Sequence, residues 1–303
     1  MKIYDSEFGR QPEALELQVG SNLPSFLEGT EQCRKKILDE LGLPLPPIKV
    51  SASINLKPFE TVILLYGTEV AKNENDELDN NAVCVWLEKI VKDNITSFLN
   101  QRIVNGLLNK LSDYNPDVVD DVMFFKKFST SSLKIILNCL LAERVAINDM
   151  NAIMETIADY IPKIGNNPIS LLEKIREKLA YSFMDRLADK NKCVHAIFLS
   201  PSISDFLWER LARPPAEIEL SYFYLEYKDC ERVIKAASKK VQEVKVKSFF
   251  PVFICPSEIR PAFSNLLSEY FLREDYSCVS IDEYRQVESF FSIVNEGELF
   301  LDE

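Results

Sequence analysis

The chain has 303 residues, of which 47% are hydrophobic and 27% are charged. This composition is ordinary for a globular protein in water, and the length predicts two or three compact units rather than a single core. The formal net charge of −12 argues against nucleic-acid binding, because a phosphate backbone attracts lysine and arginine. The same charge disfavours adhesion to anionic lipid headgroups.

Cysteine usage and hydropathy bear on the compartment. The 7 cysteines are spread along the chain without a C-x-x-C pair, which indicates buried, reduced thiols of an intracellular protein. No apolar run approaches the ~18–20 residues that span a bilayer, and the first residues do not resemble a signal peptide. We therefore expect this chain to lie outside the membrane, either alone or as a part of a longer protein.

The first region mixes helical and strand patterns. Apolar spacing predicts a short helix over 31–41, with Gly42 in the left-handed conformation as its C-cap. Apolar residues alternate with polar ones from Ile48 to Ile54, which predicts a half-buried strand. The continuous apolar run from Thr61 to Tyr66 predicts a central strand.

A polar stretch and a long helix follow. The stretch from Lys72 to Asn81 (KNENDELDNN) has no periodicity and is expected to be an exposed loop. From Val83 to Leu99 apolar residues recur at helical spacing, which predicts an amphipathic helix.

The middle region has helical spacing only. Helices are predicted over Leu133–Leu141, from Met150 onward, and over Ile169–Leu187. Asn148 is expected to cap the second of these helices and Pro162 to end it.

Strands and helices alternate in the last region, which predicts a small α/β layer with a largely parallel sheet. The predicted strands are Val194–Leu199, Phe250–Cys255 and Cys278–Ile281, and the predicted helices are Ser202–Leu211, Asp229–Val244 and Glu258–Phe271. A lysine series from Lys235 to Lys247 follows the outer face of one helix. We interpret it as a solvated face, with a partner contact as the alternative.

Taken together, the patterns predict a multi-subdomain chain of the α+β or α/β class. A mixed α/β subdomain is expected over residues 1–95, an all-helical subdomain over 96–190 and an α/β subdomain over 191–303. The charged junction from Asp189 to Lys192 marks the second boundary.

Groups that carry chemistry are scarce. His195 is the single histidine and lies within the apolar run VHAIFL, where a structural role is expected rather than general-base catalysis. Cys193 and His195 share one strand face, but nothing nearby completes the four ligands of a zinc site. Glycine-rich nucleotide motifs are absent. We therefore predict no catalytic residue, no cofactor and no metal, and so no enzyme.

Four segments, in order, resemble the family of flagellar and injectisome export-gate proteins (the FlhA/InvA/LcrD, or FHIPEP, family). Two carry a helix–LG–x–x–x–PP–strand passage and a strand ending in a G-x-E-x-A turn. The other two are similar to the family's LL-x-E-x-V-x-I-R-D-L helix start and its P-V-L-x-x-x-P-x-L-R-P pattern. In this chain they read ILDELGLPLPPIKV (37–50), NLKPFETVILLYGTEVA (55–71), LLAERVAINDMNAIMETIADY (140–160) and PVFICPSEIRPAFSNLL (251–267).

This resemblance implies a docking platform for protein transport at the cytoplasmic face of the bacterial inner membrane. Members of the family carry a membrane-embedded half, and their cytoplasmic halves assemble as a nine-subunit ring. The ring receives chaperone–substrate complexes and contacts the export-ATPase stalk and the regulator that switches substrate class. Two alternatives stay open: a stand-alone adaptor of the same family, and an α/β enzyme that uses His195.

One departure from the family concerns an inserted subdomain. Members usually carry it between the G-x-E-x-A turn and the next amphipathic helix, where it forms one wall of the chaperone cleft. Here only the polar stretch KNENDELDNN separates Ala71 from Ala82, and it has no apolar face to bury. We therefore expect the insertion to be missing, which favours a divergent flagellar-type member.

Five residues are candidates for partner contacts. Val83 and Trp86 lie on the helix that borders the missing subdomain, and aromatic side chains are frequent binding anchors. Trp86 alternatively packs inside. Arg144 and Asp149 flank the start of the third family-like segment and either pair across a turn or serve the ring interface. Arg260 either fixes the loop before its helix or contacts a partner.

Overall fold

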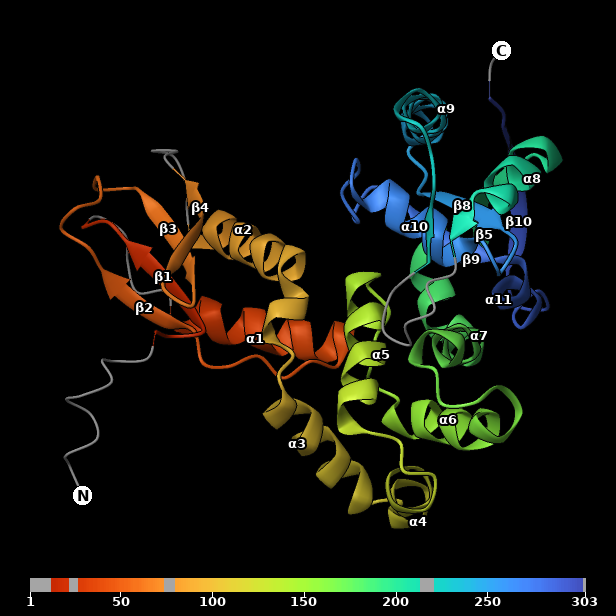
Figure 1. Cartoon of the computed structure of the whole chain (residues 1–303). Helices are drawn as coiled ribbons and strands as arrows, with labels where there is room; N and C mark the ends of the chain where they lie inside the picture. The colour runs from red at the N-terminus through yellow and green to blue at the C-terminus, as the bar shows by residue number, and fades with distance from the viewer. Residues whose placement is uncertain (1–11, 22–26, 74–79, 213–220, 302–303) are drawn as a thin grey trace. The chain divides into compact units, whose positions relative to one another are not determined.

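The computed structural model describes residues 12–21, 27–73, 80–212 and 221–301. The chain forms two compact units, Met1–Ile103 and Val104–Glu303, which Figure 1 colours from red to gold and from yellow to blue. Within the described ranges, no helix is both long enough and apolar enough to cross a membrane.

The first unit contains a four-stranded sheet in the order β2-β1-β3-β4. β1 runs parallel to β2 and antiparallel to β3, so that Leu17 lies opposite Val50 on one side and Ile63 on the other. The predicted central strand is thus confirmed as an inner strand. The strands are β1 (Leu15–Val19), β2 (Lys49–Ala52), β3 (Thr61–Leu65) and β4 (Thr68–Asn73).

Helices α1 (Leu27–Leu41) and α2 (Asn80–Asp93) pack together and extend to the same side of this sheet (Figure 1). They bury the apolar stripes that their spacing predicts. Gly42 has φ +76° and donates its N–H to the Leu38 carbonyl, which confirms the predicted C-cap of α1. A 3₁₀ turn, Ile95–Phe98, follows α2, and α3 (Gln101–Ser112) runs across the boundary between the units.

Three predictions for this unit need correction. The strand expected to reach Ile54 ends at Ala52, because β2 is an edge strand, and the Ile54 side chain is fully exposed. Lys72 and Asn73 belong to β4 rather than to a loop, since they pair with β3. Residues 74–79 of the expected loop lie outside the described residues. The helix expected to reach Leu99 ends at Asp93.

The second unit begins with helices. Asp149, and not the predicted Asn148, caps α6, because its carboxylate accepts a hydrogen bond from the Ala152 N–H at 2.9 Å. Pro162 lies inside α6, and Gly165, at φ +80°, follows the last residue of the helix. The elements are α4 (Pro116–Val119), the π-helix η2 (Asp120–Phe125), α5 (Thr130–Ala142), α6 (Met150–Ile164) and α7 (Pro168–Leu187).

A parallel four-stranded sheet in the order β10-β5-β8-β9 completes the second unit, and it confirms the predicted α/β layer. Figure 1 shows α8 and α9 on one side of this sheet and α7 and α11 on the other. The strands are β5 (Cys193–Leu199), β8 (Pro251–Cys255), β9 (Ser277–Ser280) and β10 (Ser292–Leu299), and a separate pair is formed by β6 (Leu211–Ala212) and β7 (Tyr222–Phe223). The helices are α8 (Pro201–Glu209), α9 (Tyr227–Val246), α10 (Arg260–Ser268) and α11 (Ile281–Arg285).

The core of the α/β part joins the sheet to the helices that cover it. Ile197 and Phe253 from the strands pack with Ile203, Val233 and Phe263 from α8, α9 and α10. The predicted junction at 189–192 lies within the second unit, between α7 and β5. The division into three subdomains stays a prediction.

Candidate functional site

Five charged side chains meet inside the second unit, and we call them the ion network: Glu143, Glu173, Arg176, Arg260 and Glu283. Arg260 is 0% exposed and donates hydrogen bonds to Glu143 at 2.8 Å and to Glu173 at 2.9 Å. Arg176 is 2% exposed and donates to Glu143 and to Glu283, each at 2.5 Å. Glu143 therefore accepts hydrogen bonds from both buried arginines.

Four different helices place these groups. Glu143 directly follows α5, and Glu173 and Arg176 lie one turn apart on α7, where residues at i and i+3 share a face. Arg260 is the first residue of α10. Glu283 stands in the first turn of α11, in a reciprocal capping box with Ser280. The network thus ties the helical part of the unit to its α/β part.

Two carboxylates of the ion network have pKa values shifted in opposite directions. Burial alone raises the pKa of Glu143, but the charges of Arg260 and Arg176 outweigh burial and hold that pKa at about 2. Burial raises the pKa of Glu173 above its ordinary value. Removing one partner from a buried ion pair typically costs about 3–5 kcal/mol. We therefore interpret the network as a structural lock, and Arg260 has no exposed surface with which to contact a partner.

His195 is also buried. Its Nδ1 lies 2.7 Å from a Glu296 carboxylate oxygen, its Nε2 lies 3.6 Å from Asp189, and its ring stacks on Phe249 with centroids 3.6 Å apart. A substrate cannot reach an imidazole enclosed in this way, so the geometry favours the structural role. In the described part of the chain, no group of three histidine, cysteine or acidic side chains is arranged to hold a metal ion.

The remaining sequence candidates belong to both units, Val83 and Trp86 to the first and Arg144 and Asp149 to the second. Val83 is fully buried on α2, whereas Trp86, one turn further along, is partly exposed. Arg144 is partly buried at φ +59°, just after α5. Asp149 is exposed, and its carboxylate is engaged as the cap of α6.

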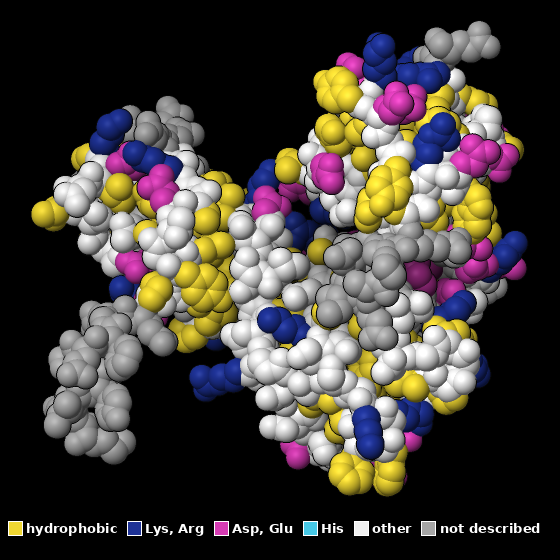
Figure 2. Space-filling model, viewed as in Figure 1, with side chains coloured by type: hydrophobic (Ala, Val, Ile, Leu, Met, Phe, Trp, Pro, Cys, Tyr) yellow, Lys and Arg dark blue, Asp and Glu magenta, His cyan; other side chains and the backbone are white. Residues whose placement is uncertain are grey.

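The structure reveals an exposed groove along α9 that sequence reasoning did not assemble. Tyr227 and Tyr270 are 80% and 54% exposed, and with Ile234 they line a space of about 590 Å³. Lys235 and Lys239 also line it, so that part of the predicted lysine series borders apolar surface. Figure 2 shows hydrophobic side chains beside basic ones in this part of the unit. We call this surface the α9 groove.

A second exposed apolar surface lies on the π-helix η2. Phe124 and Phe125 are each 73% exposed, and their rings meet edge to face with centroids 5.5 Å apart. Figure 2 shows hydrophobic side chains gathered at this end of the unit. Single π-helical turns are frequent at functional sites, and contiguous exposed apolar side chains mark interaction surfaces.

A family model decides what the chain is related to. The model for the FHIPEP family matches residues 76–287. The chain belongs to the FHIPEP family. The third and fourth family-like segments, 140–160 and 251–267, lie inside the matched range, and the first two lie before it. The resemblance inferred from the sequence is thus confirmed.

Curated relatives come from flagellar and injectisome systems. The flagellar biosynthesis protein FlhA of Treponema pallidum is 26% identical over 222 residues, which cover 73% of this chain and 30% of that protein. The protein MxiA of Shigella flexneri is 19% identical over 262 residues, which cover 84% of this chain and 35% of that protein. The chain therefore spans about a third of the length of these FHIPEP-family relatives.

Solved structures show the same fold. The Chlamydia pneumoniae CdsV protein superposes with a TM-score of 0.84 at 15% identity, over 97% of this chain and 100% of that chain. The nonameric SctV-C of EPEC superposes with a TM-score of 0.82 at 18% identity, over 96% and 99% of the two chains. The chain thus has the fold of the cytosolic domains of type III export gates.

Two residues of the ion network lie in the family-like segments, but the sequence analysis did not connect them. Glu143 is the acidic residue of the LL-x-E-x-V motif, and Arg260 is the basic residue of the P-x-L-R-P motif. The two side chains form an ion pair at 2.8 Å. The two motifs, far apart in the sequence, are thus joined by an ion pair in which Arg260 is fully buried.

Proposed function

We propose that this chain is the docking platform of a type III protein export apparatus, at the cytoplasmic face of the bacterial inner membrane. It binds chaperone–substrate complexes and hands the substrates to the membrane gate. The FHIPEP match over residues 76–287 is the observation that carries this proposal. Because the chain spans only part of its relatives' length, a membrane-embedded part belongs to the proposal as well.

A binding role fits the chemistry of the described residues better than catalysis does. The single histidine is enclosed by Glu296, Asp189 and Phe249, and the charged groups of the ion network satisfy one another. The exposed features are instead apolar or aromatic surfaces, which recognise proteins. We therefore infer a scaffold rather than an enzyme.

Self-association into a ring is the first part of the proposed role. Two solved structures of this fold are described as nonameric, that of EPEC SctV-C and that of the EscV cytosolic domain. Phe124 and Phe125 supply an exposed apolar edge that suits contact with a second copy. We propose that this edge contributes to the contact between neighbouring copies.

Docking of the export-ATPase stalk is the second part. The solved complex of the Chlamydia pneumoniae CdsV and CdsO proteins contains a chain of this fold together with a partner. We propose that the α9 groove receives the stalk. Its tyrosines offer rigid aromatic area, and Lys235 and Lys239 favour an acidic partner.

A pulldown with purified export proteins tests this role. The chain, immobilised on resin, is expected to retain the cognate ATPase stalk and a chaperone–substrate complex. The double variant Tyr227→Ser, Tyr270→Ser should lose the stalk, because the groove loses its aromatic area, and it should keep its circular dichroism spectrum. Tyr114→Ser removes an equally exposed tyrosine elsewhere in the unit and serves as the matched control.

The outcomes distinguish two claims, that the α9 groove is the stalk site and that the chain is a docking platform. If the groove variant still retains the stalk, the stalk binds at another surface of the chain. Failure of the wild-type chain to retain either the stalk or a chaperone complex would contradict the docking role itself.

A further inference from the structure

A further exposed aromatic pair lies on the second unit, where α7 meets the turn that follows α11. Tyr181 and Phe290 are 56% and 61% exposed, and their rings meet edge to face with centroids 5.4 Å apart. The buried ring of Phe291, 5.8 Å from that of Tyr181, supports the pair. We call Tyr181 and Phe290 the α7 patch.

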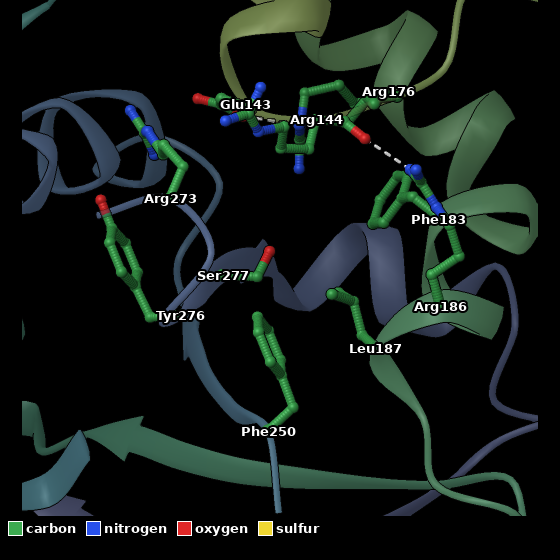
Figure 3. A pocket seen from close by; sticks show the side chains of 11 residues that line it. Glu143, Arg144, Arg176, Phe183, Arg186, Leu187, Phe250, Arg273, Tyr276 and Ser277 are labelled. Atoms are coloured by element: carbon green, nitrogen blue, oxygen red, sulfur yellow. Dashed lines mark hydrogen bonds and ion pairs between the residues drawn. The ribbon is translucent and has the colours of Figure 1, made fainter. Parts of the chain in front are cut away.

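α7 is a firm base for this patch, because its opposite side is buried. Arg176 belongs to the ion network, and its guanidinium lies 5.0 Å from the centre of the Phe183 ring. Figure 3 shows Arg176 and Phe183 facing a small cleft of the second unit. Tyr181 stands two residues before Phe183 and points away from it, since residues two apart on a helix do not share a face. The patch is thus held in place before a partner binds, which lowers the entropic cost of binding.

Charged side chains flank the other aromatic pair, Phe124 and Phe125, which we call the η2 edge. Asp120 is the first residue of η2, five positions before Phe125, and residues five apart lie on one side of a π-helix. Lys127 follows two positions after Phe125. Both charged residues are exposed, and within the described part of the chain neither takes part in an ion pair.

The α7 patch carries the same arrangement of one base and one acid. Lys178 lies one turn before Tyr181 on α7, and Glu288 lies two positions before Phe290. Both are exposed, and neither has an ion-pair partner among the residues that the structure describes. Each aromatic surface therefore offers one uncompensated positive and one uncompensated negative charge to a partner.

A closed ring with an odd number of copies needs two different surfaces on each copy. Contacts in which both copies use the same surface join copies only in pairs, and nine copies cannot be divided into pairs. The η2 edge therefore needs a mate elsewhere on the chain if this protein forms a nonamer, as two solved structures of its fold are described. The α7 patch lies apart from the edge, since η2 packs on α6 and α6 in turn packs on α7. Figure 1 shows α4, which adjoins η2, on the far side of α6 from α7 and α11.

We propose that the η2 edge of one copy binds the α7 patch of the next copy around the ring. The aromatic rings of the two surfaces bury one another, and such pairs stabilise a contact beyond the area that they bury. Asp120 then faces Lys178, and Lys127 faces Glu288. These charge pairs fix which surfaces meet and in which orientation. The inference rests on the proposed assembly into a ring and names the second surface of its contact.

Mixing two variants tests the pairing. Phe124→Ser with Phe125→Ser removes the η2 edge, and Tyr181→Ser with Phe290→Ser removes the α7 patch. At concentrations where the wild type assembles, each variant alone should stay monomeric. Their equimolar mixture should form a dimer and nothing larger, because only one intact edge and one intact patch are left to meet. Sedimentation velocity measures the masses, and circular dichroism checks that both variants keep the wild-type fold.

Charge reversal supplies a second test that leaves the aromatic rings in place. Asp120→Lys and Lys178→Glu should each raise the concentration needed for assembly by about tenfold or more, because like charges then face each other across the contact. Both changes in one chain should restore assembly. Lys228→Glu makes the same change of charge at an exposed position on α9 and should assemble like the wild type.

The results distinguish this pairing from the ring proposal itself. A wild-type chain that stays monomeric at every concentration would contradict the ring, and the pairing with it. If the wild type assembles, the pairing alone is overturned when the patch variant assembles equally well, when the mixture of folded variants stays monomeric, or when the double charge reversal assembles no better than the single ones.

Discussion

Glu143 accepts hydrogen bonds from two arginines and from the Ser264 hydroxyl, so a single carboxylate links three helices of the second unit. Replacing it by glutamine keeps the shape and removes the charge. At pH 7 we expect Glu143→Gln to lower the free energy of unfolding by about 3–5 kcal/mol, because Arg176 and Arg260 lose a counter-charge inside the protein. Urea unfolding followed by circular dichroism measures the loss.

We also predict that the stability difference between the wild type and Glu143→Gln depends on pH. The pKa of Glu143 is about 2 in the folded chain and near its ordinary 4.5 in the unfolded chain. The stability that this carboxylate contributes is therefore complete above about pH 4.5 and is lost as the pH falls towards 2. The difference between wild type and Glu143→Gln should shrink over that range, since protonation makes Glu143 neutral.

Asp185→Asn supplies the control for this residue. Asp185 pairs with Lys192 at a site where both side chains are about half exposed, and such pairs contribute about 0–1 kcal/mol. A loss from Glu143→Gln as small as that of the control, or a difference that stays constant down to pH 2, would show that the ion network is not a structural lock.

At the scale of single elements, we predict opposite effects on stability when alanine replaces two different glycines. Gly20 ends β1 against a turn, and a Cβ there would lie 1.9 Å from the Lys57 carbonyl oxygen. Gly106 lies on an exposed turn of α3, where a Cβ would meet no atom within 4 Å. Gly20→Ala should therefore destabilise the first unit. Gly106→Ala should stabilise α3 by about 0.5–1 kcal/mol, because alanine favours a helix over glycine.

Thermal unfolding by differential scanning calorimetry compares the two variants under one condition. A stabilising effect of Gly20→Ala would show that the turn at Lys57 is not packed against β1. A destabilising effect of Gly106→Ala would show that this face of α3 is covered.

The sequence predicted those helices and strands whose apolar pattern is recognisable within a few residues. The amphipathic helices and the apolar strands β3, β5 and β8 have clear periodicity or continuous apolar runs, and the structure confirms them. β1 and β10 were not predicted, because charged residues interrupt their apolar pattern and each strand is defined by its pairing with neighbouring strands. Pairing of this kind is a tertiary property that a single segment does not encode.

The ion network lay beyond sequence reasoning for a related reason. Arg176 and Glu283 are 107 positions apart, and Arg260 and Glu143 are 117 apart. No periodicity connects such positions, and a lone charged residue on a predicted helix is usually solvated. Arg260 was singled out from its motif, but its partners emerged only when the four helices were placed in space.

At the scale of the whole molecule, the exposed edge on η2 makes a prediction about assembly. Phe124→Ser with Phe125→Ser should shift the chain from larger assemblies towards the monomer, because an apolar contact between copies is lost. Light scattering after size-exclusion chromatography over a range of concentrations measures the shift. The Tyr227→Ser, Tyr270→Ser variant is the control, since it alters the other exposed aromatic surface. Equal assembly of both variants and the wild type would remove this edge from the interface.

The long separations within the ion network set an order of events on the ribosome. At about 5–20 residues per second, the 107 positions between Arg176 and Glu283 take roughly 5–20 s to synthesise. The β10 strand that completes the parallel sheet emerges later still. During that interval the helices of the nascent second unit display charges and apolar faces whose counterparts do not yet exist. We therefore expect the nascent second unit to be prone to aggregation until β10 has been synthesised.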